Sequence, residues 1–207
     1  MYFTRIPNWI QKLFPKAIWK IPNDNNKIYL TFDDGPSVCL EWILKTLKER
    51  SIKATFFCLG ENLEKSDSVN SILAGGHQIA NHSFGHEDGW KASRSHYLKS
   101  VGRCQELIDK LAPENKKLFR PPYGRITPGQ IKSLKTDFKV IQWTLMAGDF
   151  DQGIDPARHV EKLIQKTRSG DIIVFHDNEK SKANLETMLP RYLDGCLDRG
   201  FEFGVIG

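Results

Sequence analysis

The sequence has only four cysteines and no long apolar run, and each shortage narrows the class of protein. The four are expected to be buried thiols, because they lie far apart and form no Cys-x-x-Cys pair; they are Cys39, Cys58, Cys104 and Cys196. A zinc knuckle is therefore not expected. No segment approaches the ~20 consecutive apolar residues that span a bilayer, so no transmembrane helix is expected either.

The N-terminal segment lacks the pattern of a signal peptide. Arg5, Pro7 and Lys12 interrupt the stretch where a signal peptide needs unbroken apolar residues. With no recognisable signal peptide or transmembrane helix, a cytoplasmic or membrane-associated location is favoured.

The chain is expected to consist of an arm and one domain. We expect residues 1–26 to form an N-terminal arm packed on or beside a domain that spans residues 27–207. Apolar residues recur in the arm at helical spacing with lysines between them, so weak membrane association through residues 5–20 is the alternative to packing on the domain.

Composition and charge are those of an ordinary globular protein. The 207 residues are 40% hydrophobic and 27% charged, enough to bury a core without disulfides or structural metals. The net charge is +5, and its basic residues are dispersed rather than clustered. We therefore expect no nucleic-acid partner. We also expect a monomer.

Apolar runs alternate with helical patterns along the whole domain. Strands are expected at residues 27–32, 53–59, 77–81, 117–120, 139–145, 171–176 and 201–206. Helices are expected at residues 38–50, 61–76, 93–112, 127–135, 155–170 and 182–200. This alternation predicts an α/β fold with parallel strands, either an open doubly wound sheet or a barrel of about seven strands. The absence of a Gly-x-Gly-x-x-Gly or Walker motif argues against a nucleotide-binding version.

Ionisable residues follow the ends of five expected strands. They are Asp33 and Asp34, His82 and His86, Arg120, Asp149, and His176. In a closed α/β barrel, the carboxyl ends of all strands meet on one face, which carries the active site. The sequence therefore predicts a single cluster of these side chains.

Two histidines and one aspartate of this cluster suit a catalytic metal. Imidazole and carboxylate donors together favour zinc or another first-row divalent ion, and three protein ligands leave a coordination position open. His82 and His86 have the spacing of a metalloprotease helix, but Ser83 stands where that motif has glutamate, so a metalloprotease is excluded. Because side chains alternate along a strand, one of Asp33 and Asp34 can ligate the ion while the other acts as base.

Four motifs in this order resemble those of a known family. The segments TFDDGP (31–36), HSFGH (82–86), RPPYG (120–124) and IIVFHD (172–177) are similar to the motifs of the polysaccharide deacetylase family, the NodB-homology domain of carbohydrate esterase family 4. The resemblance extends over residues 27–206. It implies a distorted (β/α) barrel with about seven parallel strands.

The resemblance also implies a role for each strand-end residue. Asp33 matches the catalytic base, Arg120 the arginine that pairs with it, His176 the catalytic acid, and Asp149 the carboxylate that orients this histidine. The ligands of one divalent ion match Asp34, His82 and His86. Zinc is the leading expectation, with cobalt, manganese or nickel as alternatives.

The substrate-binding residues implied by the resemblance are Pro122, Tyr123, Phe150 and Val174. Two of them depart from the family pattern, since phenylalanine replaces the usual tryptophan at position 150 and valine replaces leucine at position 174. Phe150 keeps an aromatic wall but lacks the indole donor. Neither change removes a reacting group.

The implied activity is metal-dependent removal of N-acetyl groups, a hydrolysis of a non-peptide carbon–nitrogen bond, from an acetylated polysaccharide or oligosaccharide of the chitin or peptidoglycan type. Two alternatives stay open: O-deacetylation of an acetylated xylan, and a catalytically silent carbohydrate-binding domain that keeps the metal. Since Asp33 and His176 are both present, the silent domain is disfavoured.

Overall fold

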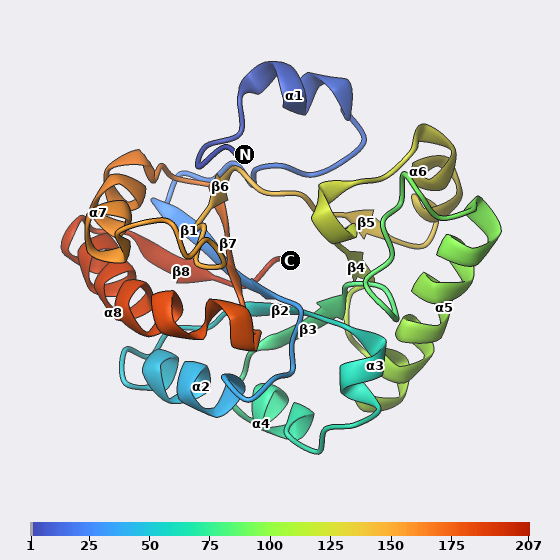
Figure 1. Cartoon of the computed structure of the whole chain (residues 1–207), viewed down its shortest axis with the longest axis horizontal. Coiled ribbons are helices and arrows are strands. Elements are labelled where there is room, and N and C mark those ends of the chain that lie inside the picture. Colours follow the sequence, from blue (N-terminus) through green and yellow to red (C-terminus); the bar gives the residue numbers. More distant parts are fainter. Residues whose placement is uncertain (1) are drawn as a thin grey trace.

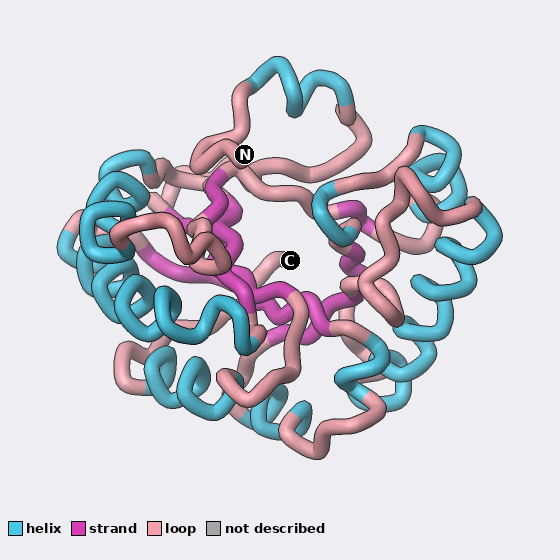
Figure 2. Tube along the Cα trace, in the orientation of Figure 1, coloured by secondary structure: helices cyan, strands magenta, loops and turns pink. Residues whose placement is uncertain are grey.

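A curved sheet of parallel strands forms the centre of the molecule in a computed structural model that describes residues 2–207. The strands are β1 (Lys27–Asp33), β2 (Thr55–Cys58), β3 (Gln78–Asn81), β4 (Leu118–Phe119), β5 (Lys139–Val140), β6 (Leu145–Met146), β7 (Ile172–His176) and β8 (Glu202–Gly204). Seven of them follow the order β5-β4-β3-β2-β1-β7-β6, and β8 pairs with the start of β1. Figure 2 shows them as a curved inner wall, so the expected α/β fold with a distorted barrel is confirmed.

Helices surround this wall on the outside (Figure 1). They are α1 (Asn8–Leu13), α2 (Leu40–Lys48), α3 (Gly60–Leu63), α4 (Val69–Ala74), α5 (Arg94–Leu111), α6 (Pro128–Leu134), α7 (Pro156–Lys166) and α8 (Lys182–Asp198). The side chain of Thr127 caps α6 in a capping box, and the carboxylate of Asp155 accepts two backbone hydrogen bonds at the start of α7. Both helices begin where the sequence pattern predicts.

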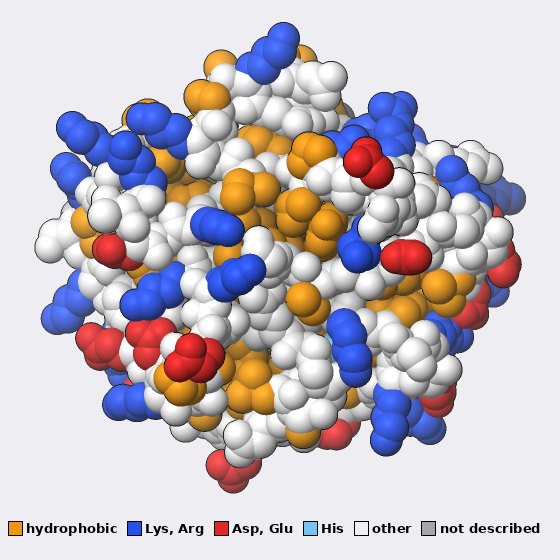
Figure 3. Space-filling model, turned by 180° about the vertical axis from the view of Figure 1, so that it is seen from behind, with side chains coloured by type: hydrophobic (Ala, Val, Ile, Leu, Met, Phe, Trp, Pro, Cys, Tyr) orange, Lys and Arg blue, Asp and Glu red, His pale blue; other side chains and the backbone are white. Residues whose placement is uncertain are grey.

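The main core lies between the sheet and its helices. Phe32 of β1 stacks on Phe56 of β2 with ring centroids 5.0 Å apart, and both rings are buried. The four cysteines are buried free thiols, as the sequence predicts. On the opposite side of the molecule from the view in Figure 1, lysine, arginine and acidic side chains are interspersed over the surface (Figure 3).

Two expected elements are each divided in the structure. The helix expected at residues 61–76 forms two short helices, α3 and α4. The strand expected at residues 139–145 forms β5 and β6, which lie at opposite ends of the seven-strand order. The chain between them crosses from one edge of the curved wall to the other.

The N-terminal arm supplies backbone partners to this crossing segment. The N–H groups of Ile18 and Ile6 donate to the carbonyls of Val140 and Thr144, at 2.8 and 2.9 Å. Gln142 N–H donates back to the carbonyl of Ile18 at 2.8 Å. Buried backbone groups need such partners. The arm therefore supplies the backbone hydrogen bonds that residues 140–144 lack where the pairing of strands is interrupted.

Side chains on either side of α1 hold the arm against the domain, while α1 itself projects outward (Figure 1). Arg5 forms an ion pair with Asp171, whose side chain is fully buried. Ala17 is buried against the domain, whereas α1 itself has no buried residue. Nowhere in residues 2–207 is there a helix long and apolar enough to cross a membrane.

Candidate active site and metal centre

The three expected metal ligands meet at the carboxyl ends of β1 and β3. Donor atoms of Asp34, His82 and His86 all lie within 4.8 Å of one another. Asp34 Oδ1 lies 3.2 Å from His86 Nε2 and 3.5 Å from His82 Nε2. This oxygen is buried and has no hydrogen-bond partner within the described part of the chain. Two imidazole nitrogens and an unpartnered carboxylate oxygen that converge in this way fit a divalent cation.

Hydrogen bonds and loop geometry turn the ligand nitrogens toward this centre. His82 Nδ1 donates to the carbonyl of Arg120 at 2.8 Å, which leaves the lone pair of Nε2 free for a metal. His86 Nδ1 lies 3.2 Å from the hydroxyl of Tyr123, so its Nε2 faces Asp34. Asp34, His86 and Tyr123 have φ angles of 76°, 59° and 57°. Such conformations are costly for these residue types and are concentrated at functional sites.

Asn178 holds the second oxygen of the carboxylate ligand. Its side-chain amide donates to Asp34 Oδ2 at 2.7 Å, while its own oxygen accepts the Ser181 N–H at 2.9 Å. This bond leaves Oδ1 of Asp34 to face the histidines. Sequence reasoning missed Asn178, although its position directly after His176-Asp177 at a strand end is a signal that could have found it.

Asp33 is buried beside a fully buried arginine. Its Oδ1 accepts a hydrogen bond from Arg120 Nη1 at 2.6 Å, and its Oδ2 lies 3.9 Å from His82 Nε2. The Arg120 guanidinium also packs over the ring of Phe57 at 4.0 Å. Burial lowers the pKa of Arg120, and the charge of Asp33 opposes that change. One oxygen of Asp33 is therefore fixed by a cation, while the other faces the candidate metal centre.

His176 and Asp149 form a second pair in the cluster. His176 Nδ1 donates to Asp149 Oδ1 at 2.8 Å, and the backbone N–H of His176 donates to Asp149 Oδ2 at 2.7 Å. Burial by itself lowers the pKa of His176, but the charge and hydrogen bond of Asp149, together with the charges of Asp34 and Asp33, outweigh it and raise the pKa to about 9. The neighbouring carboxylate, Asp151, makes no contact of this kind with His176 in residues 2–207.

These groups open into a cavity of about 500 Å³. Among the expected substrate-binding residues, Tyr123 and Phe150 line it, with the Phe150 ring 5.1 Å from His176 and edge-on to it. Pro122 and Val174 do not line the cavity and are buried. Val174 packs in the same apolar cluster as Phe150, beneath the cavity wall.

The cavity also has walls that sequence reasoning missed. They include Tyr2, Trp143, Met146 and Lys180. Tyr2 comes from the N-terminal arm and contacts the Phe150 ring at 5.1 Å, in an edge-to-face arrangement. No local pattern could have placed it there, because the contact joins residues that lie far apart in the sequence.

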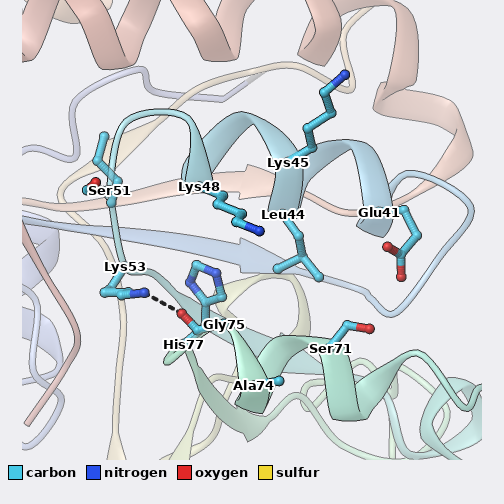
Figure 4. Close-up of a pocket in the computed structure, with 11 residues that line it drawn as sticks. Glu41, Leu44, Lys45, Lys48, Ser51, Lys53, Ser71, Ala74, Gly75 and His77 are labelled. Atoms are coloured by element: carbon cyan, nitrogen blue, oxygen red, sulfur yellow. Dashed lines mark hydrogen bonds between the residues drawn. The ribbon is translucent and has the colours of Figure 1, made fainter.

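A larger cleft of about 670 Å³ lies elsewhere, between α2 and the turn that leads into β3 (Figure 4). Lysine side chains from α2 and Lys53 line it together with His77. Burial, and then the charge of Lys53, lower the pKa of His77 to about 4, so its Nδ1 accepts the Ala54 N–H. None of the clustered strand-end residues lines this cleft, which is therefore not the candidate active site.

The fold and this cluster define an α/β-barrel protein whose aspartate–histidine–histidine cluster could hold a metal ion. A family model described as polysaccharide deacetylase matches residues 20–137. The chain belongs to the polysaccharide deacetylase family, carbohydrate esterase family 4.

Curated relatives bear related names. A peptidoglycan-N-acetylglucosamine deacetylase of Bacillus cereus is 32% identical over 174 residues, which cover 82% of this chain and 62% of the relative. A chitooligosaccharide deacetylase of Rhizobium leguminosarum bv. trifolii is 30% identical over 159 residues, 75% of this chain and 73% of the relative. The chain spans only 29% of another relative, a bifunctional xylanase/deacetylase of Pseudobutyrivibrio xylanivorans, at 30% identity.

Solved structures agree with the fold over most of the chain. A crystal structure of a peptidoglycan N-acetylglucosamine deacetylase superposes with a TM-score of 0.87 at 28% identity, covering 96% of this chain and 94% of the other. A family 4 carbohydrate esterase from Streptomyces lividans, in complex with acetate, has a TM-score of 0.79 at 27% identity and covers 88% of this chain and 94% of the other.

Proposed function

We propose that this protein is a metal-dependent hydrolase that removes acetyl groups from N-acetylglucosamine units of a peptidoglycan- or chitin-type polymer. The observation that carries the proposal is the grouping of a ligand set, a buried base and a paired histidine in one cavity. The names of the relatives support an N-acetylated sugar as the substrate.

The ligand set would hold one divalent ion. Asp34, His82 and His86 supply two nitrogens and one carboxylate oxygen, a set that suits zinc or another first-row divalent ion, and zinc is our leading candidate. When bound, such an ion polarises the acetyl carbonyl and makes water more acidic.

Asp33 and His176 divide the proton transfers between them. Asp33 takes a proton from the attacking water, and the hydrogen bond from Arg120 orients this carboxylate. A new carbon–oxygen bond forms, and the carbon–nitrogen bond of the amide breaks. His176 gives its proton to the leaving nitrogen, so the products are acetate and a free amino sugar. We assign the stabilisation of the developing oxyanion to the main-chain N–H of Tyr123, because Pro122 has no N–H and the N–H of Gly124 donates to the carbonyl of Pro121.

Release of acetate from defined substrates tests the proposal. The substrates are chitooligosaccharides, peptidoglycan and acetylxylan, each with one added metal at a time. We expect acetate from the first two, and none with His176→Ala. Acetate from acetylxylan alone would replace the proposal by O-deacetylation, which the name of the bifunctional relative also suggests. No acetate from any of them would favour a carbohydrate-binding domain.

Elemental analysis tests the ligand set separately. We expect one divalent ion per chain in protein purified without chelator, and loss of this ion in His82→Ala. His96→Ala is the matched control, because the side chain of His96 is 66% exposed and lies outside the ligand set. Equal metal content in the wild type and in His82→Ala would refute the assignment.

A further inference from the structure

A row of contacting side chains leads from the candidate metal centre to the surface. The ring of Tyr123 lies 4.5 Å from that of His86, measured between centroids. The guanidinium of Arg125 lies 5.5 Å from the Tyr123 ring and 5.1 Å from the ring of Trp90. Tyr123 is 59% exposed and Trp90 is 61% exposed. Two large aromatic rings are thus held in solvent next to the cavity, with a cation between them.

Buried and charged groups fix the geometry of this row. Asp88 Oδ2 accepts a hydrogen bond from Arg125 Nη1 at 2.5 Å, and its Oδ1 accepts one from the backbone N–H of Trp90 at 3.0 Å. The buried side chain of Gln130 donates to the carbonyl of Gly89 at 2.8 Å. A Cβ atom at Gly89 would overlap the carbonyl oxygen of Arg125, so the two loops touch through their backbones. The backbone beneath the two rings is therefore held in place, and the Arg125 guanidinium that lies against both rings is fixed by Asp88.

We propose that Trp90 and Tyr123, with Arg125 between them, form a platform for the sugar rings that flank the reacting unit of the substrate chain. The proposal rests on the proposed function and adds a second binding region to its site. One face of a pyranose ring is lined by C–H groups and its rim by hydroxyls, which matches an exposed aromatic ring beside hydrogen-bond donors. Tyr123 and Arg125 also line the cavity, so the platform is continuous with the candidate active site.

The charge of the platform favours a neutral sugar over a nucleic acid. Single-stranded nucleic acids also stack on aromatic rings, but their binding needs unpaired cations along the phosphate backbone. The charge of Arg125 is neutralised by an ion pair with Asp88, whose Oδ2 lies 2.5 Å from Arg125 Nη1. The row therefore offers stacking surface and hydrogen-bond donors with little net charge.

Chain-length dependence of the reaction tests the platform. We expect Trp90→Ala to lower kcat/KM on a chitohexaose substrate roughly tenfold, the scale of one lost aromatic stacking contact, through KM. Activity on chitobiose should stay near the wild-type value, and Trp90→Tyr should restore most of the loss on the hexamer. Trp9→Ala is the matched control, because Trp9 is 62% exposed but lies on α1 of the arm.

Several outcomes would overturn the platform. They are an unchanged hexamer reaction in Trp90→Ala, an equal loss on dimer and hexamer, or preferential binding of a single-stranded oligonucleotide at Trp90. Isothermal titration calorimetry with chitohexaose separates this proposal from the proposed function, since it measures binding directly and does not depend on acetate release. Binding that is lost only in Trp90→Ala would support the platform even if the wild type released no acetate, whereas equal binding by both proteins would refute it.

Discussion

Replacing Asp149 by asparagine should change the protonation of His176 and remove one of the two hydrogen bonds that join these residues. The side chain of Asp149 is fully buried and accepts two hydrogen bonds from His176, at 2.7 and 2.8 Å. Asparagine has nearly the same shape, so the change removes the negative charge while it keeps an oxygen that can accept one of these bonds.

The structure sets the direction and size of the effect. Burial lowers the pKa of His176, but the charge and hydrogen bond of Asp149 lead a net rise from 6.5 to about 9. This difference corresponds to about 3 kcal/mol in favour of the imidazolium, at ~1.4 kcal/mol per pKa unit. Without the carboxylate, the main influence that opposes burial is removed, and we expect the pKa of His176 to fall toward its ordinary value.

The pH dependence of kcat on an N-acetylated oligosaccharide is the assay. The rate should be bell-shaped in pH because Asp33 must be ionised while His176 is protonated. In Asp149→Asn the alkaline limb should move to lower pH and the plateau should fall, with metal content unchanged. Asp151→Asn is the matched control and should leave the limb in place. An alkaline limb that does not move in Asp149→Asn would show that it reports a group other than His176.

The same pair predicts how stability depends on pH. A histidine whose pKa is raised by folding stabilises the folded state fully below its unfolded pKa of 6.5, and this contribution is lost as the pH rises through about 9. The melting temperature of the wild type should therefore fall across this window by more than that of Asp149→Asn. If the melting temperatures of the two proteins fell equally with pH, Asp149 would not be the group that raises the pKa of His176.

Three further changes test separate parts of the site. Arg120→Met leaves the candidate base buried without its cation, and we expect a loss of about 3–5 kcal/mol in the free energy of unfolding, measured by urea denaturation; an unchanged value would refute the role of this ion pair. Asn178→Ala releases Oδ2 of Asp34 and should weaken metal affinity roughly 10-fold in a chelator competition, whereas unchanged affinity would show that Asn178 does not position the ligand. Asp33→Asn should abolish acetate release and keep the metal, while Asp34→Asn should lose the metal; the opposite pattern would exchange the two roles.

Local patterns determined most of the fold and the membership of the central cluster. The apolar runs that become β1 and β7 end at Asp33 and His176, and such runs depend on neighbouring residues alone. The carboxyl ends of parallel strands lie at one edge of the sheet, and in a barrel they come together on one face. The sequence could therefore predict that His82 and Arg120 lie near Asp33. The structure adds the atoms involved, such as the bond from His82 Nδ1 to the carbonyl of Arg120.

Only the tertiary structure decided which distant segments complete the site. Residues 139–145 read as one apolar strand, but the curvature of the wall divides them, and backbone bonds from Thr4, Ile6 and Ile18 fill the interruption. Asn178 could be found near a strand end, but its bond to Asp34 depends on how two loops approach each other. Contacts of this kind join residues that have no common periodicity, and their geometry is set by sheet curvature and loop packing rather than by the local sequence.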